Sequence, residues 1–244
     1  MTFPTNPGAG QTPGSGSPWG SQMTARPVVE ASTTFLSHAF MWMFAGLLLT
    51  AAVAFLVQGS ERLLDIAAGA FLPIIIGQLV LVMVISWGIN RLSATAALGL
   101  FFVYAASLGL TIGLIVTAYS GESVVSAFLT ASGMFGGAAL YGATTKRSLA
   151  GLGGFLTMGV IGLLVALVVN LFLASSPFGW LLSIIGVGLF TVLTAYDVQR
   201  ISAGSLVART GSVEKAAVLG ALSLYLDFVN LFLFLLRLFG GGRR

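Results

Sequence analysis

The sequence has 244 residues, of which 57% are hydrophobic and only 7% are charged, with a formal net charge of +4. Soluble domains carry about 25% charged residues, so this composition excludes a water-soluble domain of this size. The absence of cysteine excludes disulfides and thiolate catalysis, and the single histidine, His38, excludes metal sites built from histidine and cysteine. The composition therefore predicts an integral membrane protein that acts without a bound cofactor and is not an enzyme.

Residues 1–30 differ in composition from the rest of the chain. They hold five of the seven prolines, interleaved with glycines, and they lack the basic start and apolar core of a signal peptide. Such a segment buries too little apolar surface to offset the entropy lost on ordering. We expect residues 1–30 to form a disordered, uncleaved cytoplasmic tail and residues 31–244 to form the membrane domain.

Long apolar runs fill the membrane domain, without the polar alternation that is typical of a transmembrane barrel. They predict an all-α membrane protein, a bundle of seven transmembrane helices. Short connections indicate antiparallel neighbours, apart from one connection of about 18 residues before the last segment. The predicted spans are residues 36–57, 66–89, 94–118, 123–143, 150–173, 178–198 and 216–239.

Basic residues favour a cytoplasmic N-terminus, because cytoplasmic loops are enriched in lysine and arginine. In this orientation seven basic residues lie inside and four outside. The inside residues are Arg26, Arg91, Lys146, Arg147, Arg200, Arg209 and Lys215, and the outside residues are Arg62, Arg237, Arg243 and Arg244.

Pairs of glycines recur at a spacing of four residues within two of the predicted spans. These are Gly109 with Gly113, and Gly133 with Gly137. Small residues at this spacing let helix backbones approach closely in lipid. We expect both pairs to mark tight helix packing rather than chemistry.

Asp227 stands out because it lies near the middle of the last span. An aspartate at that depth costs roughly 2.5–3.5 kcal/mol on insertion scales, so it requires a compensating environment. Ser223, Asn230 and Arg237 fall on the same helix face and complete a polar stripe. A helix of this kind is predicted to lie at the centre of the bundle, with the stripe facing polar partners or water.

Asp197 lies at the end of the sixth span, and the long connection could return the chain so that it meets Asp227. Two carboxylates in a low-dielectric site do not both ionise readily, so such a pair is expected to hold a proton and to respond to pH near neutrality. Arg91, at the end of the second span, is a candidate counter-ion that would act as a latch. Gln78, in the middle of that span, is a candidate neighbour of Arg237. Structural polar contacts within the bundle are the alternative for all of these residues.

Other membrane functions fit less well. A retinal protein needs a lysine in its last helix, and both lysines lie in predicted loops. An intramembrane aspartyl protease would need a Gly-x-Gly-Asp context, which Asp227 lacks.

Three motifs resemble the Bax inhibitor-1 (TMBIM, YccA-like) family of membrane proteins. The last span reads Ser-Leu-Tyr-Leu-Asp-Phe-Val-Asn-Leu-Phe over residues 223–232, and residues 141–147 and 195–199 match the family in order and spacing. The resemblance covers residues 31–240. It implies a seven-helix fold whose last helix is surrounded by the other six.

The same resemblance implies a pH-sensitive calcium leak in a bacterial inner membrane. Asp197 and Asp227 match the family's proton sensor and form a candidate transient calcium site. Arg91 matches an arginine at the end of the second helix, and Arg237 matches a last-helix arginine that pairs with a glutamate in some relatives; here Gln78 stands at that level. Two alternatives remain open: a membrane protein that modulates a membrane-bound AAA protease or a stress response, and a proton-coupled transporter of a small solute.

Overall fold

A computed structural model describes the backbone of residues 20–240 and the side chains of residues 35–240. This part of the chain is helical and contains no strand. Its elements are α1 (Gly20–Gln58), α2 (Glu61–Gly69), α3 (Phe71–Gly88), α4 (Ala94–Val116), α5 (Gly121–Thr144), the short 3-10 helix η1 (Ala150–Leu152), α6 (Gly153–Leu173), α7 (Ser176–Ser202), α8 (Ser205–Thr210) and α9 (Val213–Gly240). Seven helices among these residues are long and apolar enough to cross a membrane, which confirms the predicted all-α, seven-helix membrane fold.

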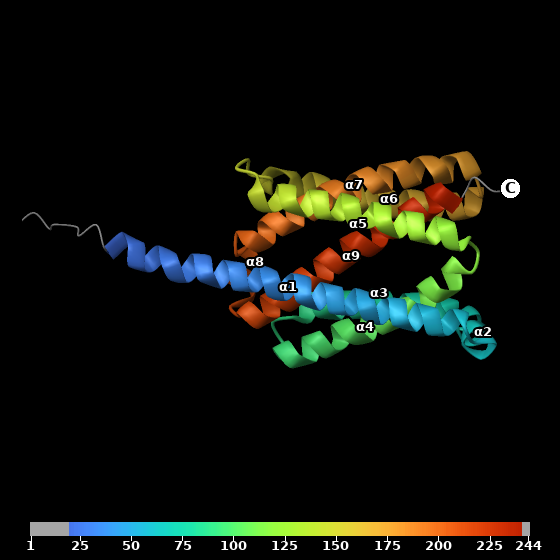
Figure 1. The fold of residues 1–244 in the computed structure, drawn as a ribbon, viewed down its shortest axis with the longest axis horizontal. Coiled ribbons are helices and arrows are strands. Elements are labelled where there is room, and N and C mark those ends of the chain that lie inside the picture. The colour runs from blue at the N-terminus through green and yellow to red at the C-terminus, as the bar shows by residue number, and fades with distance from the viewer. Residues whose placement is uncertain (1–19, 241–244) are drawn as a thin grey trace, which may run out of the picture.

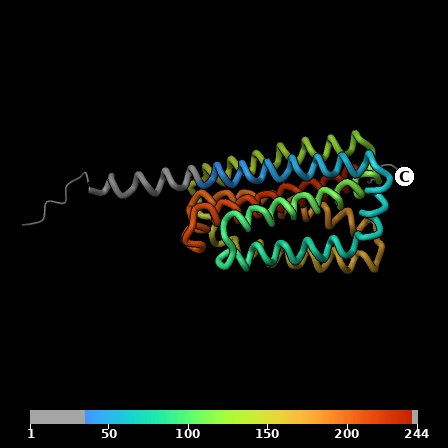
Figure 2. Tube along the Cα trace, turned by 90° about the horizontal axis from the view of Figure 1, so that it is seen from below, coloured from blue at the N-terminus to red at the C-terminus, as the bar shows by residue number. Residues whose placement is uncertain are grey.

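The last helix, α9, runs through the middle of the bundle (Figures 1 and 2). It packs against α1, α4, α5, α7 and α8. In its most apolar stretch 78% of the residues are buried inside the protein, against 11% in α3, which lies at the periphery. The predicted central position of the last helix is therefore confirmed.

The bundle has two ends, which we name after the short helices that lie there. The α8 end carries the connections from α3 to α4, from α5 to α6 and from α7 to α9. The α2 end carries the connections from α1 to α3, from α4 to α5 and from α6 to α7 (Figure 1).

Local sequence explains where several helices begin and end. Four helices start after a serine whose hydroxyl accepts a hydrogen bond from the backbone N–H three residues later, which satisfies one of the free donors of the first turn. These serines are Ser60, Ser93, Ser120 and Ser175. Glycine flanks both ends of α8, where Gly204 (φ 69°) and Gly211 (φ 65°) adopt the left-handed conformation that favours this residue.

Three boundaries differ from the predicted ones. The predicted span 66–89 contains the end of the separate helix α2 and then α3, with the break at Ala70. The long connection before the last span contains α8. Helix α1 begins at Gly20 and so takes in residues 20–30 of the predicted disordered tail, while residues 1–19 lie outside the described residues.

The two glycine pairs have different surroundings. A Cβ on Gly109 would lie 2.6 Å from Val53 Cβ, and one on Gly113 would lie 2.8 Å from Val57 Cβ, so both glycines bring α4 tightly against α1. This packing confirms the prediction for the first pair. The prediction is wrong for the second pair, because no atom lies within 4 Å of a Cβ built on Gly133 or Gly137.

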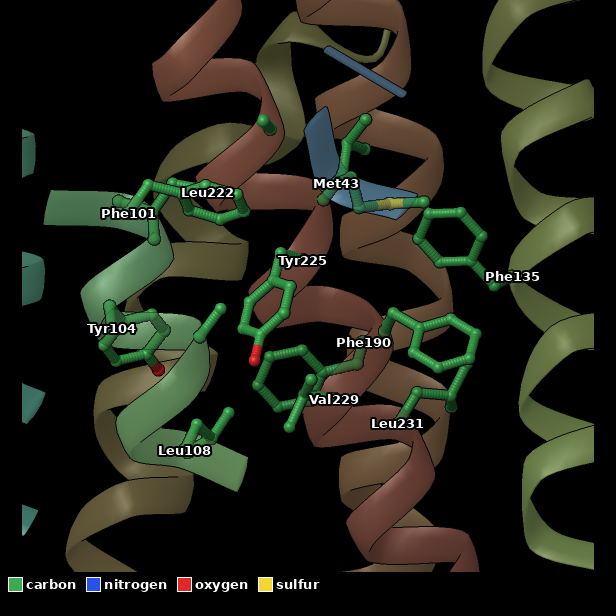
Figure 3. Packing of buried hydrophobic residues seen from close by; sticks show 14 of the residues in the cluster. Met43, Phe101, Tyr104, Leu108, Phe135, Phe190, Leu222, Tyr225, Val229 and Leu231 are labelled. Carbon is green, nitrogen blue, oxygen red and sulfur yellow. The ribbon is translucent and has the colours of Figure 1, made fainter. Parts of the chain in front are cut away.

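The core is rich in aromatic rings that surround Tyr225 of α9. Figure 3 shows Tyr225 directed toward α4, where it makes edge contacts with Phe101 and Tyr104 at centroid distances of 5.5 and 5.8 Å. Its hydroxyl oxygen lies 2.6 Å from the hydroxyl of Thr50 on α1. These contacts hold α9 in one rotational setting within the bundle.

Candidate functional site

Four of the predicted site residues, Asp197, Ser223, Asp227 and Arg237, lie along the antiparallel interface between α7 and α9. The contacts fall at three successive levels between the α8 end and the α2 end. The first level contains carboxylates, the second contains aromatic rings and the third contains an arginine. Along the α9 stripe, Ser223 and Asp227 both meet Asp197 of α7, and Arg237 meets Gly179 of α7.

At the first level Asp197 and Asp227 lie close enough for their charges to act on each other, as the sequence predicted. Asp227 is 2% exposed and Asp197 is 8% exposed. Ser223, one turn before Asp227, is hydrogen-bonded to the Asp197 side chain. Asp227 Oδ2 is buried and has no hydrogen-bond partner among the described residues. A buried carboxylate oxygen of this kind is satisfied by a bound proton, an ordered water or an adjacent cation.

Arg200 provides the cation nearest to this pair. Its Nη1 lies 4.0 Å from Asp197 Oδ1, and its side chain is 34% exposed. Arg91, the predicted counter-ion, is exposed just beyond the end of α3, and no ion pair joins it to either aspartate in the described part of the chain. The charged partner of Asp197 in the described part of the chain is therefore Arg200 and not Arg91. Its spacing of three residues from Asp197 was a signal that could have found it.

At the second level apolar side chains close the interface. The rings of Phe190 on α7 and Phe234 on α9 stack with a centroid distance of 5.9 Å and an interplanar angle of 30°. Gly186 makes room for this stack, since a Cβ there would lie 2.6 Å from the Phe234 ring. Leu231 is fully buried one turn earlier on α9.

At the third level Arg237 lies against Gly179 of α7 and Asn170 of α6. Asn170 and Arg237 line a pocket of about 430 Å³ at the α2 end, together with Ser175 and Ser176. The predicted proximity of Gln78 to Arg237 is wrong. Gln78 is buried and donates a hydrogen bond of 2.9 Å to Thr111 of α4. Because α3 lies outside the α7–α9 interface, Gln78 does not belong to the site.

Asn230 completes the predicted stripe without bridging to another helix. Its side-chain amide donates a 2.8 Å hydrogen bond to the Leu226 carbonyl, one turn earlier in α9. The polar stripe thus divides into inter-helix contacts at Ser223 and Asp227, a local contact at Asn230, and the Arg237 pocket.

The described residues contain no group of three or more histidine, cysteine, aspartate or glutamate side chains that could hold a metal ion. Asp197 and Asp227 offer only two carboxylates. Calcium sites that retain the ion supply six to eight oxygen ligands. The pair is therefore suited to transient contact with a cation rather than to a permanent metal site.

Comparison with known proteins decides the family. A family described as "Inhibitor of apoptosis-promoting Bax1" matches residues 32–244. The chain belongs to this family. The chain is similar to the inner membrane protein YbhL of Escherichia coli K12. The two are 44% identical over 86% of this chain and 92% of the length of YbhL.

Two further similar proteins are also bacterial. An uncharacterized protein of Deinococcus radiodurans is 43% identical over 88% of this chain and 94% of its own length. Another, from Borreliella burgdorferi, is 39% identical over 86% of this chain and 92% of its own length. The chain is thus a multi-pass integral membrane protein of the Bax inhibitor family.

Proposed function

We propose that this protein is a pH-sensitive, calcium-permeable leak channel whose proton sensor is the pair Asp197 and Asp227. One observation carries the proposal: Asp227 is buried in the central helix with an unpartnered carboxylate oxygen, beside a second buried aspartate from a neighbouring helix. Intramembrane ionisable residues are expensive and are typical of ion or proton pathways.

Proton binding changes the charge of this pair in a definite direction. Among the described residues, Arg200 from α7 and Asp227 from α9 are the charged groups that act on Asp197. With both carboxylates ionised, Arg200 is attracted to Asp197. A proton on the pair weakens that attraction, so the contact loosens as pH falls. Arg200 then serves as the latch.

In the proposed mechanism, the conformation described here is the closed one. The Phe190–Phe234 stack and Leu231 separate the aspartates from the Arg237 pocket at the α2 end. Ion passage requires α7 and α9 to move apart at this level. The Asp197–Arg200 contact lies within α7, so its loosening acts on that movement by changing the charge beside the α7–α9 interface.

We propose that the α8 end faces the cytoplasm of a bacterium. We also propose that the membrane is the inner membrane, as in the name of the Escherichia coli relative. Described basic residues are concentrated at this end, which supports the orientation. They are Arg91, Lys146, Arg147, Arg200, Arg209 and Lys215, against Arg62 and Arg237 at the α2 end.

The test is calcium flux in proteoliposomes that contain a calcium dye, measured from about pH 8 to about pH 6. Wild-type protein should show pH-dependent flux. Asp227→Asn should give flux that no longer varies with pH, because the amide cannot titrate. Glu61→Gln, which removes an exposed acid from α2, is the matched control and should behave as wild type.

Absence of calcium flux at every pH would refute the channel. That result would favour the alternative, a membrane protein that modulates a protease or another partner. Uptake of a small solute that saturates and depends on a pH gradient would instead identify a proton-coupled transporter.

A further inference from the structure

A second pocket lies at the α8 end, about one helical turn along α7 from Asp197. Its volume is about 440 Å³, and it opens between the connection from α5 to α6 and the turn from α7 to α8. Its lining residues are Lys146, Arg147, Ser148, Ala150, Tyr196, Gln199, Arg200, Ala203 and Ser205.

The charged side chains that line this pocket are all positive. Lys146, Arg147 and Arg200 line it, together with the hydroxyl-bearing Ser148 and Ser205, and no aspartate or glutamate is among its lining residues. Neither Lys146 nor Arg147 forms an ion pair with a carboxylate in the described part of the chain. Three cations that converge on one pocket without anions are suited to an anionic ligand.

Gln199 holds the basic connection in place over α7. Its Nε2 donates a 2.8 Å hydrogen bond to the Arg147 carbonyl, and its Oε1 accepts a 2.7 Å hydrogen bond from the Leu149 N–H. The Tyr196 hydroxyl packs against Gly153 at the start of α6, where a Cβ would lie 2.5 Å away. The pocket is therefore built by specific contacts rather than by two loose loops.

Membrane topology alone does not explain this arrangement. Basic residues collect at one membrane end whether or not they form a site. Two other basic residues at the α8 end are engaged elsewhere: Arg209 donates to the Ser86 carbonyl of α3 at 3.1 Å, and Lys215 donates to the Asn90 carbonyl in the turn after α3 at 3.4 Å. Within residues 35–240, the side chains of Lys146 and Arg147 make no such contact and instead border the pocket.

We propose that this pocket binds a phosphate group, carried either by the headgroup of an anionic phospholipid or by a small soluble phosphate ester. Guanidinium groups match the geometry of phosphate oxygens, and lysine adds a point charge. Basic pockets between transmembrane helices at the cytoplasmic side suit lipid headgroups. Because Arg200 also contacts Asp197 at 4.0 Å, a bound phosphate would compete with that carboxylate for the same guanidinium.

The experiment measures binding to the full-length protein in a neutral detergent by native mass spectrometry. The probes are phosphatidylglycerol, phosphatidylcholine and soluble glycerol 3-phosphate. The test variant is Lys146→Gln with Arg147→Gln, two exposed side chains whose loss leaves the Gln199 contacts with the backbone intact. Arg91→Gln is the matched control, since it removes an exposed charge at the same end and outside the pocket.

Wild-type protein and the Arg91→Gln control should bind phosphatidylglycerol in preference to phosphatidylcholine. The double variant should bind phosphatidylglycerol about 30-fold more weakly, as expected for two lost cations. Competition by glycerol 3-phosphate would assign the site to soluble phosphates, and its failure to compete would assign it to the lipid. Equal binding of phosphatidylglycerol by the double variant and the control would overturn the proposal. Absence of phosphatidylglycerol binding by both the double variant and the control would also overturn it. This readout does not depend on calcium flux.

Discussion

The hydroxyl oxygens of Thr50 on α1 and Tyr225 on α9 lie 2.6 Å apart in the interior of the bundle. Thr50 also donates toward the Ala105 carbonyl of α4, at 2.8 Å, so one threonine links three helices. Tyr225 stands two residues before Asp227. This polar contact therefore fixes the rotation of α9 that points Asp227 toward α7.

Tyr225→Phe should lower the free energy of unfolding by about 1 kcal/mol, because hydrogen bonds between membrane helices contribute about this much. Unfolding in mixed micelles, followed by circular dichroism, measures the effect. Tyr104→Phe is the control, since the structure gives no hydrogen bond for that hydroxyl among the described residues and the ring contact with Tyr225 is kept. Equal destabilisation by the two variants would contradict the assigned role.

Gly109→Leu should destabilise the protein by about 1–3 kcal/mol, because the side chain would enter the α1–α4 contact, where a Cβ alone meets Val53 at 2.6 Å. Gly133→Leu should be nearly neutral, since open space surrounds that position. Thermal unfolding of both variants in detergent provides the comparison. A tolerated Gly109→Leu would show that α1 and α4 pack less tightly than described.

Arg200→Gln should raise calcium flux at about pH 8 by about two- to fivefold, the range expected for loss of a partly exposed ion pair. Flux at about pH 6 should change less, because protonation of the aspartates has already weakened the contact. The pH dependence is thus flattened. Arg91→Gln should retain the wild-type profile. If calcium flux lost its pH dependence in Arg91→Gln alone, the role of latch would belong to Arg91, as the family resemblance implied.

Phe234→Ala should increase flux across the whole pH range, because it removes one ring of the stack that separates the aspartates from the α2 end. Phe172→Ala is the matched control, since Phe172 is 87% exposed on α6. Proteoliposome flux, normalised to the amount of monodisperse protein incorporated, measures the difference. Unchanged flux in Phe234→Ala would place the barrier elsewhere along α9.

The absence of native cysteine makes the orientation directly measurable. In intact bacteria, a membrane-impermeant maleimide should label Glu61→Cys at the α2 end and should leave Lys146→Cys at the α8 end unlabelled. Both positions are exposed, so a difference in labelling reports the side of the membrane on which each position lies. Labelling of Lys146→Cys should appear only after the membrane is permeabilised. The opposite pattern would reverse the proposed topology.

The sequence predicts the seven spans well because sustained apolar character is a strong signal in a membrane protein. It also identifies Asp197 and Asp227, because a carboxylate in lipid needs a compensating environment. The division between α2 and α3 was missed, since the break at Ala70 lies within a mostly apolar run.

Side-chain partners were harder to predict than spans. Several basic residues share the α8 end, and hydropathy does not show that Arg200 rather than Arg91 contacts Asp197. Gln78 lies on α3, which is apolar on nearly every side, so the hydropathy pattern of this helix does not indicate which of its faces meets α4. Its hydrogen bond to Thr111 depends on a helix rotation that only the assembled bundle sets.

The position of α9 has a consequence for biogenesis. Helix α9 follows α1, α4, α5, α7 and α8 in the chain, so these helices enter the bilayer before the helix that they pack against has been synthesised. Their inward faces must remain accessible until α9 leaves the ribosome and inserts among them. Asp227 crosses into the membrane during that last step, and it reaches its partner on α7 only when the assembly closes around it.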